Sequence, residues 1–351
     1  TTCRVVGGGE LRVPFLARPF RIGGVDAPNR VVLAPMAGLT CSAYRRHLKS
    51  HGVGLVTTEM VSAYGLTYHN VRTTEYLEFA EEERPIAVQL FGDTPDVVAR
   101  AAELVLSRAM VPDMIDINMG CPVRKVVKTG AGAALLGDPD RAVAMAAAVV
   151  RAAAENGTPV TVKLRSGLRT GDRTAVELAP RLEQVGVAAL GVHPRAACEF
   201  YRGRADHTIT AAVVAAVGIP VMASGDVTSV ESAQAVVETT GAAALMVARG
   251  VAGDPWLVDA MLFPESVMPS GRGATRPPLP EVVADLRRLL GRVVEERGPE
   301  RAARWIRKVL GWYLRPSGVP VPMIDELRAL TDAGRLDAAL AGLIERTQQT
   351  A

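Results

Sequence analysis

The chain has 351 residues, of which 48% are hydrophobic and 22% are charged, and its formal net charge is +3. This is ordinary globular composition with ample apolar material for a large core. The basic excess is too small to argue by itself for a nucleic-acid partner. The length fits one domain of about 250 residues and a smaller one of about 80.

Four cysteines, at Cys3, Cys41, Cys121 and Cys198, are scattered and form no Cys-x-x-Cys pair and no zinc-ligand spacing. They predict reduced thiols in a reducing compartment and no metal site. The first residues lack the apolar run of a signal peptide, and no apolar stretch reaches the roughly 18 residues that span a bilayer. The sequence therefore predicts a soluble, cytoplasmic protein without membrane association.

From Arg30 to about Phe263 one pattern recurs, in which a short apolar run is followed by a turn and an Ala-rich stretch of helical length. The apolar runs predict eight strands, at Val31–Ala34, Leu55–Thr58, Ile86–Leu90, Met114–Asn118, Val160–Leu164, Ala189–His193, Pro220–Ala223 and Ala244–Val247. Nearly uniform apolarity is typical of parallel strands that are buried on both faces. Helix-start signals such as Asp138-Pro139 and Thr228-Ser229 separate the strands. Eight such units predict an α/β fold, a (β/α)8 TIM barrel.

The segments on either side of the barrel have their own patterns. Phe20–Asn29 predicts a hairpin with a Gly23-Gly24 turn that plugs the bottom of the barrel. Pro264–Pro280 is rich in Pro and Gly and predicts a linker, and helix is expected from Glu281 onward. The predicted organisation is an N-terminal segment with the hairpin (1–29), the barrel (30–263), the linker (264–280) and an all-α helical domain (281–351).

Polar residues and glycines stand at nearly all the C-terminal strand ends, where barrels of this kind carry their active sites. In chain order these ends hold Pro35-Met36-Ala37, Glu59-Met60, Gln89, Asn118 to Pro122, Lys163 with Arg165, His193 with Arg195, Ser224-Gly225-Asp226 and Ala248-Arg249-Gly250. The last two follow the seventh and eighth strands, the usual place of a phosphate cradle. The alternative is that Gly225 and Gly250 only shape turns.

Four of these side chains can carry chemistry. Lys163 can stabilise negative charge on a reduced flavin or form a Schiff base, unless it is only a solvated lysine. Gln89 has the donors and the acceptor that suit the edge of a heterocycle, although it can equally be a capping amide. Cys121, between Gly120 and Pro122, can act as proton donor or nucleophile, whereas a free cysteine is most often a small buried hydrophobe. His193 also stands at a strand end; the other four histidines are interpreted as ordinary surface or loop residues.

Two motifs resemble those of the tRNA-dihydrouridine synthase family, and most closely its bacterial B-type branch. The first runs from Ala34 to Thr40, and the second from Asp116 to Pro122 with Lys125, Gly130-Ala131-Gly132 and Leu135-Leu136 after it. The similarity covers roughly Arg30 to Trp256 and resumes at Arg307 to Leu314. The second motif is highly specific, whereas other flavin barrels contain something like the first.

The resemblance implies a redox cycle in which NADPH reduces FMN, and the flavin then delivers hydride to C6 of a uridine in the D loop of tRNA. Cys121 matches the cysteine that protonates C5, and His193 matches a residue near the flavin and the base. The implied FMN contacts are Pro35, Met36, Ala37, Gln89, Lys163, His193, Ser224, Gly225, Asp226, Ala248 and Arg249. The implied substrate contacts in the barrel are Asn118, Lys163, Arg165 and Arg195.

The sequence departs from the family pattern at several positions. The family usually has Asn at Ser224, Gly at Ala248, and often His at Val309. It usually has Gly-Arg-Thr where Pro194-Arg195-Ala196 stands. Because Ser224 keeps a hydroxyl and Gly225 remains, flavin binding is expected to survive.

Positive charge is concentrated near the C-terminus, where Arg287 to Arg315 contains nine Lys or Arg against three Glu. At about 100° per residue, Arg297, Arg301, Arg304, Lys308 and Arg315 fall on one stripe, and Trp305, Ile306, Val309, Leu310, Trp312 and Tyr313 cover another face. This pattern predicts a helix that tracks tRNA phosphates through Arg301, Arg304 and Lys308. Without the barrel motifs, a solvated basic face would be an equally good interpretation.

Three other functions are compatible with parts of the sequence. The first is an FMN-dependent barrel that acts on a free small molecule. The second is a Schiff-base aldolase or phosphate-sugar enzyme that uses Lys163, and the third is a catalytically silent tRNA-binding protein or folding chaperone. The expected partner is tRNA, and the expected state is a monomer.

Overall fold

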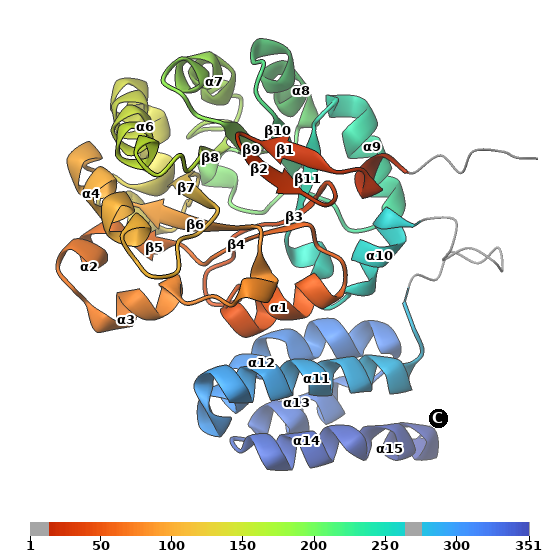
Figure 1. Cartoon of the computed structure of the whole chain (residues 1–351). Helices are drawn as coiled ribbons and strands as arrows, with labels where there is room; N and C mark the ends of the chain where they lie inside the picture. The colour runs from red at the N-terminus through yellow and green to blue at the C-terminus, as the bar shows by residue number, and fades with distance from the viewer. Residues whose placement is uncertain (1–13, 264–275, 351) are drawn as a thin grey trace, which may run out of the picture.

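The computed structural model describes residues 14–263 and 276–350. Its centre is a closed barrel of parallel strands (Figure 1). The strands are β3 (Val31–Leu33), β4 (Leu55–Thr57), β6 (Ile86–Phe91), β7 (Met114–Met119), β8 (Val160–Arg165), β9 (Ala189–His193), β10 (Val221–Ser224) and β11 (Ala244–Val247). Each pairs with its neighbours in this order, and β11 pairs with β3 to close the ring. The predicted TIM barrel and its eight strands are confirmed.

Helices surround the barrel. They are α1 (Ser42–Ser50), α2 (Ala63–Thr67), α3 (Val71–Thr74), α4 (Pro95–Leu106), α5 (Arg124–Val127), α6 (Pro139–Ala154), α7 (Thr174–Gln184), α8 (His207–Ala216), α9 (Val230–Thr240) and α10 (Trp256–Leu262). The Asp138 side chain accepts from the Arg141 N–H at the start of α6, and Ser229 accepts from Ser232 at the start of α9. Such caps satisfy N–H groups that have no partner within the helix. The helix-start signals read from the sequence are thus confirmed.

Shorter elements complete the barrel. A two-residue strand, β5 (Val61–Ser62), extends the pairing of β6. Short 3-10 segments are η1 (Phe15–Ala17), η2 (Glu75–Leu77), η3 (Glu81–Glu83), η4 (Gly132–Gly137), η5 (Ala197–Glu199) and η6 (Arg249–Val251), and one more, η7 (Arg315–Ser317), follows the barrel near the C-terminus.

The predicted hairpin is present as β1 (Phe20–Ile22) and β2 (Val25–Ala27), which pair antiparallel. Its apolar side chains belong to the same buried cluster as Met114 and Ala189, the first residues of β7 and β9. Gly23 has a φ of +56°, and a Cβ there would lie 2.8 Å from the Cβ of Pro159. The hairpin therefore closes the N-terminal end of the barrel, as predicted.

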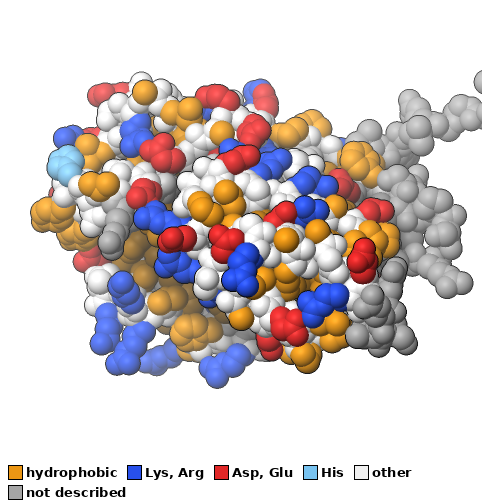
Figure 2. All heavy atoms as spheres, turned by 90° about the horizontal axis from the view of Figure 1, so that it is seen from below, with side chains coloured by type: hydrophobic (Ala, Val, Ile, Leu, Met, Phe, Trp, Pro, Cys, Tyr) orange, Lys and Arg blue, Asp and Glu red, His pale blue; other side chains and the backbone are white. Residues whose placement is uncertain are grey.

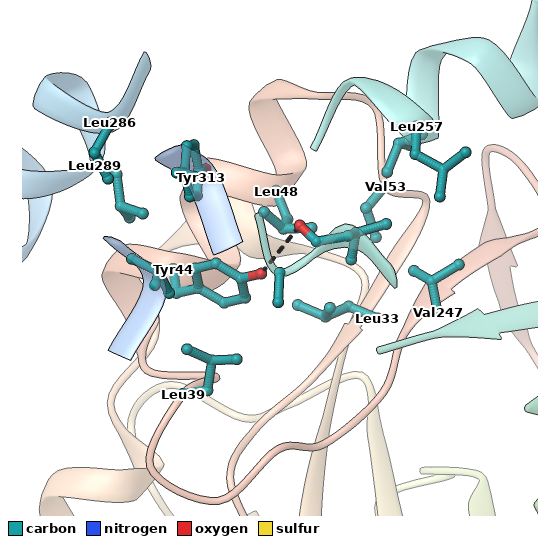
Figure 3. Packing of buried hydrophobic residues seen from close by; sticks show 14 of the residues in the cluster. Leu33, Leu39, Tyr44, Leu48, Val53, Val247, Leu257, Leu286, Leu289 and Tyr313 are labelled. Carbon is teal, nitrogen blue, oxygen red and sulfur yellow. Dashed lines mark hydrogen bonds between the residues drawn. The ribbon is translucent and has the colours of Figure 1, made fainter. Parts of the chain in front are cut away.

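Five helices follow: α11 (Leu279–Arg297), α12 (Pro299–Leu314), α13 (Val321–Ala329), α14 (Ala333–Ala341) and α15 (Leu343–Thr350). They form a layer beneath the barrel, on the side of α1 (Figure 1). One hydrophobic cluster joins this layer to the barrel and includes Leu33 of β3, Leu48 of α1, Leu286 of α11 and Tyr313 of α12 (Figure 3). The barrel and the helices therefore share one continuous hydrophobic cluster.

Several details differ from the sequence predictions. Strand β8 continues to Arg165, which pairs with His193 of β9, so Lys163 lies inside the strand and not at its end. Helix α11 already begins at Leu279, and residues 264–275 of the predicted linker lie outside the described residues. Trp312 was expected to pack inward with the other aromatic residues, but it is 46% exposed.

The histidines show a further difference. His47 and His51, expected at the surface, are buried and both hydrogen-bond to the carboxylate of Asp285 on α11. Their partners lie more than 230 residues along the chain, which local sequence patterns do not register. Among the described residues, no helix is long and apolar enough to cross a membrane.

Candidate active site at the C-terminal end of the barrel

A chain of hydrogen bonds inside the barrel leads to the loop that carries Cys121. Thr161 Oγ1 and Gln89 Nε2 donate to the two oxygens of Asp116, over 2.5 and 2.6 Å. Asn118 Nδ2 donates to Gln89 Oε1 over 2.8 Å. Asn118 Oδ1 then accepts from the backbone N–H of Cys121 over 2.9 Å. The amides of Gln89 and Asn118 thus both bind protein groups, and through them the strands fix the position of the cysteine loop.

The Cys121 loop is also held from outside. Arg165 Nε donates to the Gly120 carbonyl over 2.9 Å. A Cβ on Gly132 would lie 2.8 Å from the Cys121 carbonyl oxygen, so only glycine fits there. Burial raises the pKa of the Cys121 thiol, although Arg165 and Lys163 partly oppose the shift. At neutral pH the group is therefore a thiol that retains its proton.

Lys163 stands on β8 beside the same loop. In the described part of the chain, its ammonium forms no hydrogen bond and no ion pair. Burial and the neighbouring Arg165 lower the pKa of Lys163 to about 8. An unpartnered cation in the barrel interior is costly unless an anion or a polar ring meets it. This ammonium fits the edge of a flavin ring that gains negative charge on reduction.

His193, the last residue of β9, is buried next to several cations. Burial, followed by the charges of Lys163 and Arg165, lowers the pKa of His193 to about 2. Arg195 Nη1 lies 3.3 Å from His193 Nε2. Because a guanidinium can only donate, Nε2 is the acceptor, and the proton of the neutral ring is on Nδ1. His193 is therefore a neutral hydrogen-bonding group at physiological pH.

Arg195 and Asp226 bind each other. Arg195 Nη2 lies 2.8 Å from both oxygens of Asp226 and also donates to the Gly203 carbonyl. The guanidinium of Arg195 is buried, so its charge is used within the protein. This pair holds the loop after β9 against the loop after β10.

The loops after β10 and β11 have the donors that a phosphate needs. Among the described residues, the backbone N–H groups of Gly225, Asp226, Arg249 and Gly250 meet no protein acceptor. Ser224 ends β10, and Ala248 leads into the turn η6. Gly225 has a φ of +120° and lies against His193, where a Cβ would come within 3.0 Å of the ring. Free N–H groups beside an exposed arginine fit the phosphate of FMN.

The loop after β3 contains Pro35, Met36 and Ala37, and the residue that follows contacts the helical layer. The Glu59 carboxylate accepts from the Gly38 N–H, and Lys308 Nζ of α12 donates to the Gly38 carbonyl over 2.6 Å. Lys308 thus links α12 directly to the loop predicted to contact the flavin. Arg301 and Arg304 are exposed on the same helix, as the stripe predicts. Seen from below, Lys and Arg side chains mix with acidic ones and gather at the lower left edge (Figure 2).

Tyr201 is a site residue that the sequence analysis missed. It is 53% exposed, stacks on His193 with ring centroids 6.3 Å apart, and lies under the guanidinium groups of Arg165 and Arg249 at 5.4 and 4.5 Å. It stands eight residues beyond β9, so no strand-end rule selects it. The one sequence feature that could have pointed to it is a Tyr that follows the His at the end of a strand.

The structure brings most predicted site residues to one end of the barrel. They lie in the loops after β3, β7, β9, β10 and β11 and on β6 and β8. Arg301 and Arg304 lie apart from them, on α12.

Comparison with known proteins places the chain in a family. A family model described as dihydrouridine synthase matches residues 32–344. The chain is 38% identical over 294 residues to tRNA-dihydrouridine synthase B of Pseudomonas aeruginosa, covering 84% of this chain and 86% of that protein. It is 35% identical over 325 residues to the protein of the same name from Pasteurella multocida, covering 92% and 95%.

Solved structures support the fold. A variant of NCR from Zymomonas mobilis superposes with a TM-score of 0.52 at 19% identity, covering 71% of this chain and 91% of that one. A 2-naphthoyl-CoA reductase superposes with a TM-score of 0.56 at 12% identity, covering 70% and 51%. At such identities the likeness concerns the barrel alone, whereas the match over residues 32–344 shows that this chain belongs to the dihydrouridine synthase family.

Proposed function

We propose that this enzyme is a flavin-dependent tRNA-dihydrouridine synthase that reduces the C5–C6 double bond of a uridine in the D loop, with NADPH as reductant. The observation that carries the proposal is that two side chains stand together at the active end of a barrel from this family. They are the protonated thiol of Cys121 and the ammonium of Lys163, which has no partner among the described residues. When bound, FMN would supply the hydride for C6 of the uracil, with NADPH as its source.

The residues of the chain carry the other half of the addition. The Cys121 thiol gives its proton to C5, which balances the hydride at C6 and leaves a thiolate that is reprotonated from solvent. The hydrogen bonds from Asn118 and Arg165 to the cysteine loop hold the sulfur in place. Because the thiol is uncharged before the reaction, the transferred proton is present at neutral pH.

The remaining groups bind and orient. Lys163 would hold the flavin edge, and the N–H groups at Gly225 and Arg249 would hold the phosphate of FMN. Tyr201 offers a ring face to the uracil, which must leave its stack in the RNA to reach the site. Arg195 and Asp226 position the loops around His193. Asn118 and Gln89 fix the position of the cysteine loop through their hydrogen bonds inside the barrel.

The test uses the full-length protein loaded with FMN, tRNA from a strain that lacks the enzyme, and NADPH. The expected result is a flavin spectrum that NADPH bleaches and tRNA restores, with one dihydrouridine formed per NADPH consumed. A protein that takes up no FMN would contradict the proposal. Bleaching without any dihydrouridine would favour a free small molecule as substrate.

The basic stripe on α12 gives a second expected result. Replacing Arg301 and Arg304 together by Glu should weaken tRNA binding at least tenfold and flatten its salt dependence, because each phosphate contact contributes about one to the logarithmic salt slope. Flavin reduction by NADPH should not change. The measurement is tRNA affinity at several salt concentrations, with the exposed Arg335→Glu as the matched control. Equal tRNA affinities for the double variant and the control would show that tRNA does not bind this surface.

Other properties predicted from the sequence stay proposals. We propose that the helices from 281 onward form the tRNA-binding unit, joined by the segment 264–280 to the catalytic barrel of 30–263. The protein is proposed to act as a monomer in the cytoplasm, where its tRNA substrate is found.

A further inference from the structure

A hollow of about 340 Å³ lies between the loop after β11 and the C-terminal end of α12. Two arginines, a tryptophan and an acidic residue line it: Arg249, Arg315, Trp312 and Asp254. Gly253 forms part of its wall and packs against the Trp312 backbone, where a Cβ would come within 2.3 Å. The hollow is therefore built by close packing of the barrel against the helical layer.

The charges in the hollow are mostly unsatisfied. Arg276 is engaged, because it donates to the carbonyls of Gly253 and Tyr313. In contrast, the Arg315 guanidinium forms no hydrogen bond or ion pair with any described residue, whereas the Arg249 guanidinium lies 4.5 Å from the centre of the Tyr201 ring. Asp254 Oδ1 is buried without a hydrogen bond, and its nearest cation, Arg276 Nη1, is 3.9 Å away. Burial raises the pKa of Asp254, as expected of an acceptor that lacks a donor.

Trp312 is unusual among the aromatic residues of α12. Trp305 and Tyr313 are buried, whereas Trp312 lines the hollow and is 46% exposed. An exposed indole beside a free guanidinium group is a combination that binds nucleotides, because bases stack on aromatic faces and phosphates pair with Arg.

We propose that this hollow binds one nucleotide, with its base on Trp312, its phosphate on Arg315, and a hydroxyl or amino donor on Asp254. The proposal rests on the proposed function and deepens it. Arg249 also lies over Tyr201 in the active site, so the hollow adjoins the reacting base. Arg315 continues the cationic stripe of α12. Both placements favour a nucleotide of the tRNA strand next to the target uridine, although the nucleotide end of NADPH has the same chemistry.

The experiment compares Trp312→Ala, Trp312→Phe, Arg315→Glu and Asp254→Asn in the FMN-loaded full chain, with Arg335→Glu as a surface control. One readout is tRNA affinity, and another is anaerobic flavin bleaching by NADPH without tRNA. The third is quenching of tryptophan emission by tRNA and by AMP, since a base stacked on Trp312 quenches its indole. Melting temperatures verify that each variant is folded.

If the tRNA strand occupies the hollow, Trp312→Ala and Arg315→Glu each weaken tRNA binding about tenfold, the scale of one lost stack or phosphate contact. Trp312→Phe restores most of the affinity, and NADPH bleaching stays unchanged. If NADPH occupies it, the concentration of NADPH for half-maximal bleaching rises about tenfold while tRNA affinity holds. Either result supports a nucleotide site.

The site is overturned if all four variants match Arg335→Glu in both assays and neither ligand quenches Trp312. Failure of the proposed function looks different. In that case the wild-type protein forms no dihydrouridine, yet quenching that depends on Trp312 persists.

Discussion

Replacing Cys121 by alanine should lower the rate of uridine reduction by roughly 10²- to 10⁴-fold, the usual contribution of a positioned acid. The alanine removes the proton destined for C5 and leaves every hydrogen bond to the backbone of the loop in place. Flavin bleaching by NADPH and tRNA affinity should stay near wild type. The measurement is single-turnover reoxidation of the reduced flavin by tRNA.

Two variants make this result specific. Cys121→Ser keeps a proton and the shape of the side chain, but a hydroxyl is a much weaker acid, so its rate should also fall. Cys198→Ala removes an exposed thiol that contacts Thr170, and it should change nothing. A Cys121→Ala protein that reduces tRNA at the wild-type rate would assign the proton to another group.

Replacing Asp285 by alanine should lower the free energy of unfolding by about 3–5 kcal/mol, the cost of breaking a buried charge cluster. The carboxylate is fully buried and accepts from His47, His51, Tyr313 and Arg288. These donors come from α1, α11 and α12, so the loss falls on the contact between barrel and helices. Urea unfolding measures it. Asp337→Ala, which removes an exposed pair with Arg287, should cost less than about 1 kcal/mol.

The same cluster gives the stability a defined pH dependence. Burial opposes protonation of His51, but the carboxylates of Asp259 and Asp285 outweigh it and raise the pKa of His51 to about 9. Its contribution is therefore complete below pH 6.5, its ordinary pKa, and is lost as pH rises through 9. The pKa of Asp285 is lowered, so its contribution is lost only in acid. Asp285→Ala should reduce the alkaline decline, and an unchanged profile would exclude His51 as its cause.

The sequence predicts the barrel well because strands that are buried on both faces consist mostly of apolar residues. Val31–Leu33 and Ala244–Val247 are wholly apolar, and most polar site residues stand near or beyond the C-terminal end of a strand, although Asp116 and Lys163 lie inside β7 and β8. The candidate site could be predicted for the same reason, since parallel strands bring those ends together. The roles of Asn118 and Gln89 could not, because which atoms their amides meet depends on side-chain packing.

The missed features arise from contacts between distant segments. Tyr201 becomes part of the site only because the loop after β9 folds back over His193. His47 and His51 have the spacing of one helix face, but their buried partner is on α11. Trp312 is different: it stands four residues after Lys308, so at about 100° per residue it lies about 40° from that lysine, beside the cationic stripe, and 46% of it is exposed.

The core that runs without a break from Leu33 of the barrel to Tyr313 of α12 has a consequence for catalysis. A hinge motion between the two parts would expose that apolar seam and separate Asp285 from its histidines. A hinge opening of the enzyme around its substrate is therefore energetically unfavourable. The enzyme is therefore expected to bind tRNA without moving its two parts, so the change that unstacks the uridine takes place in the RNA.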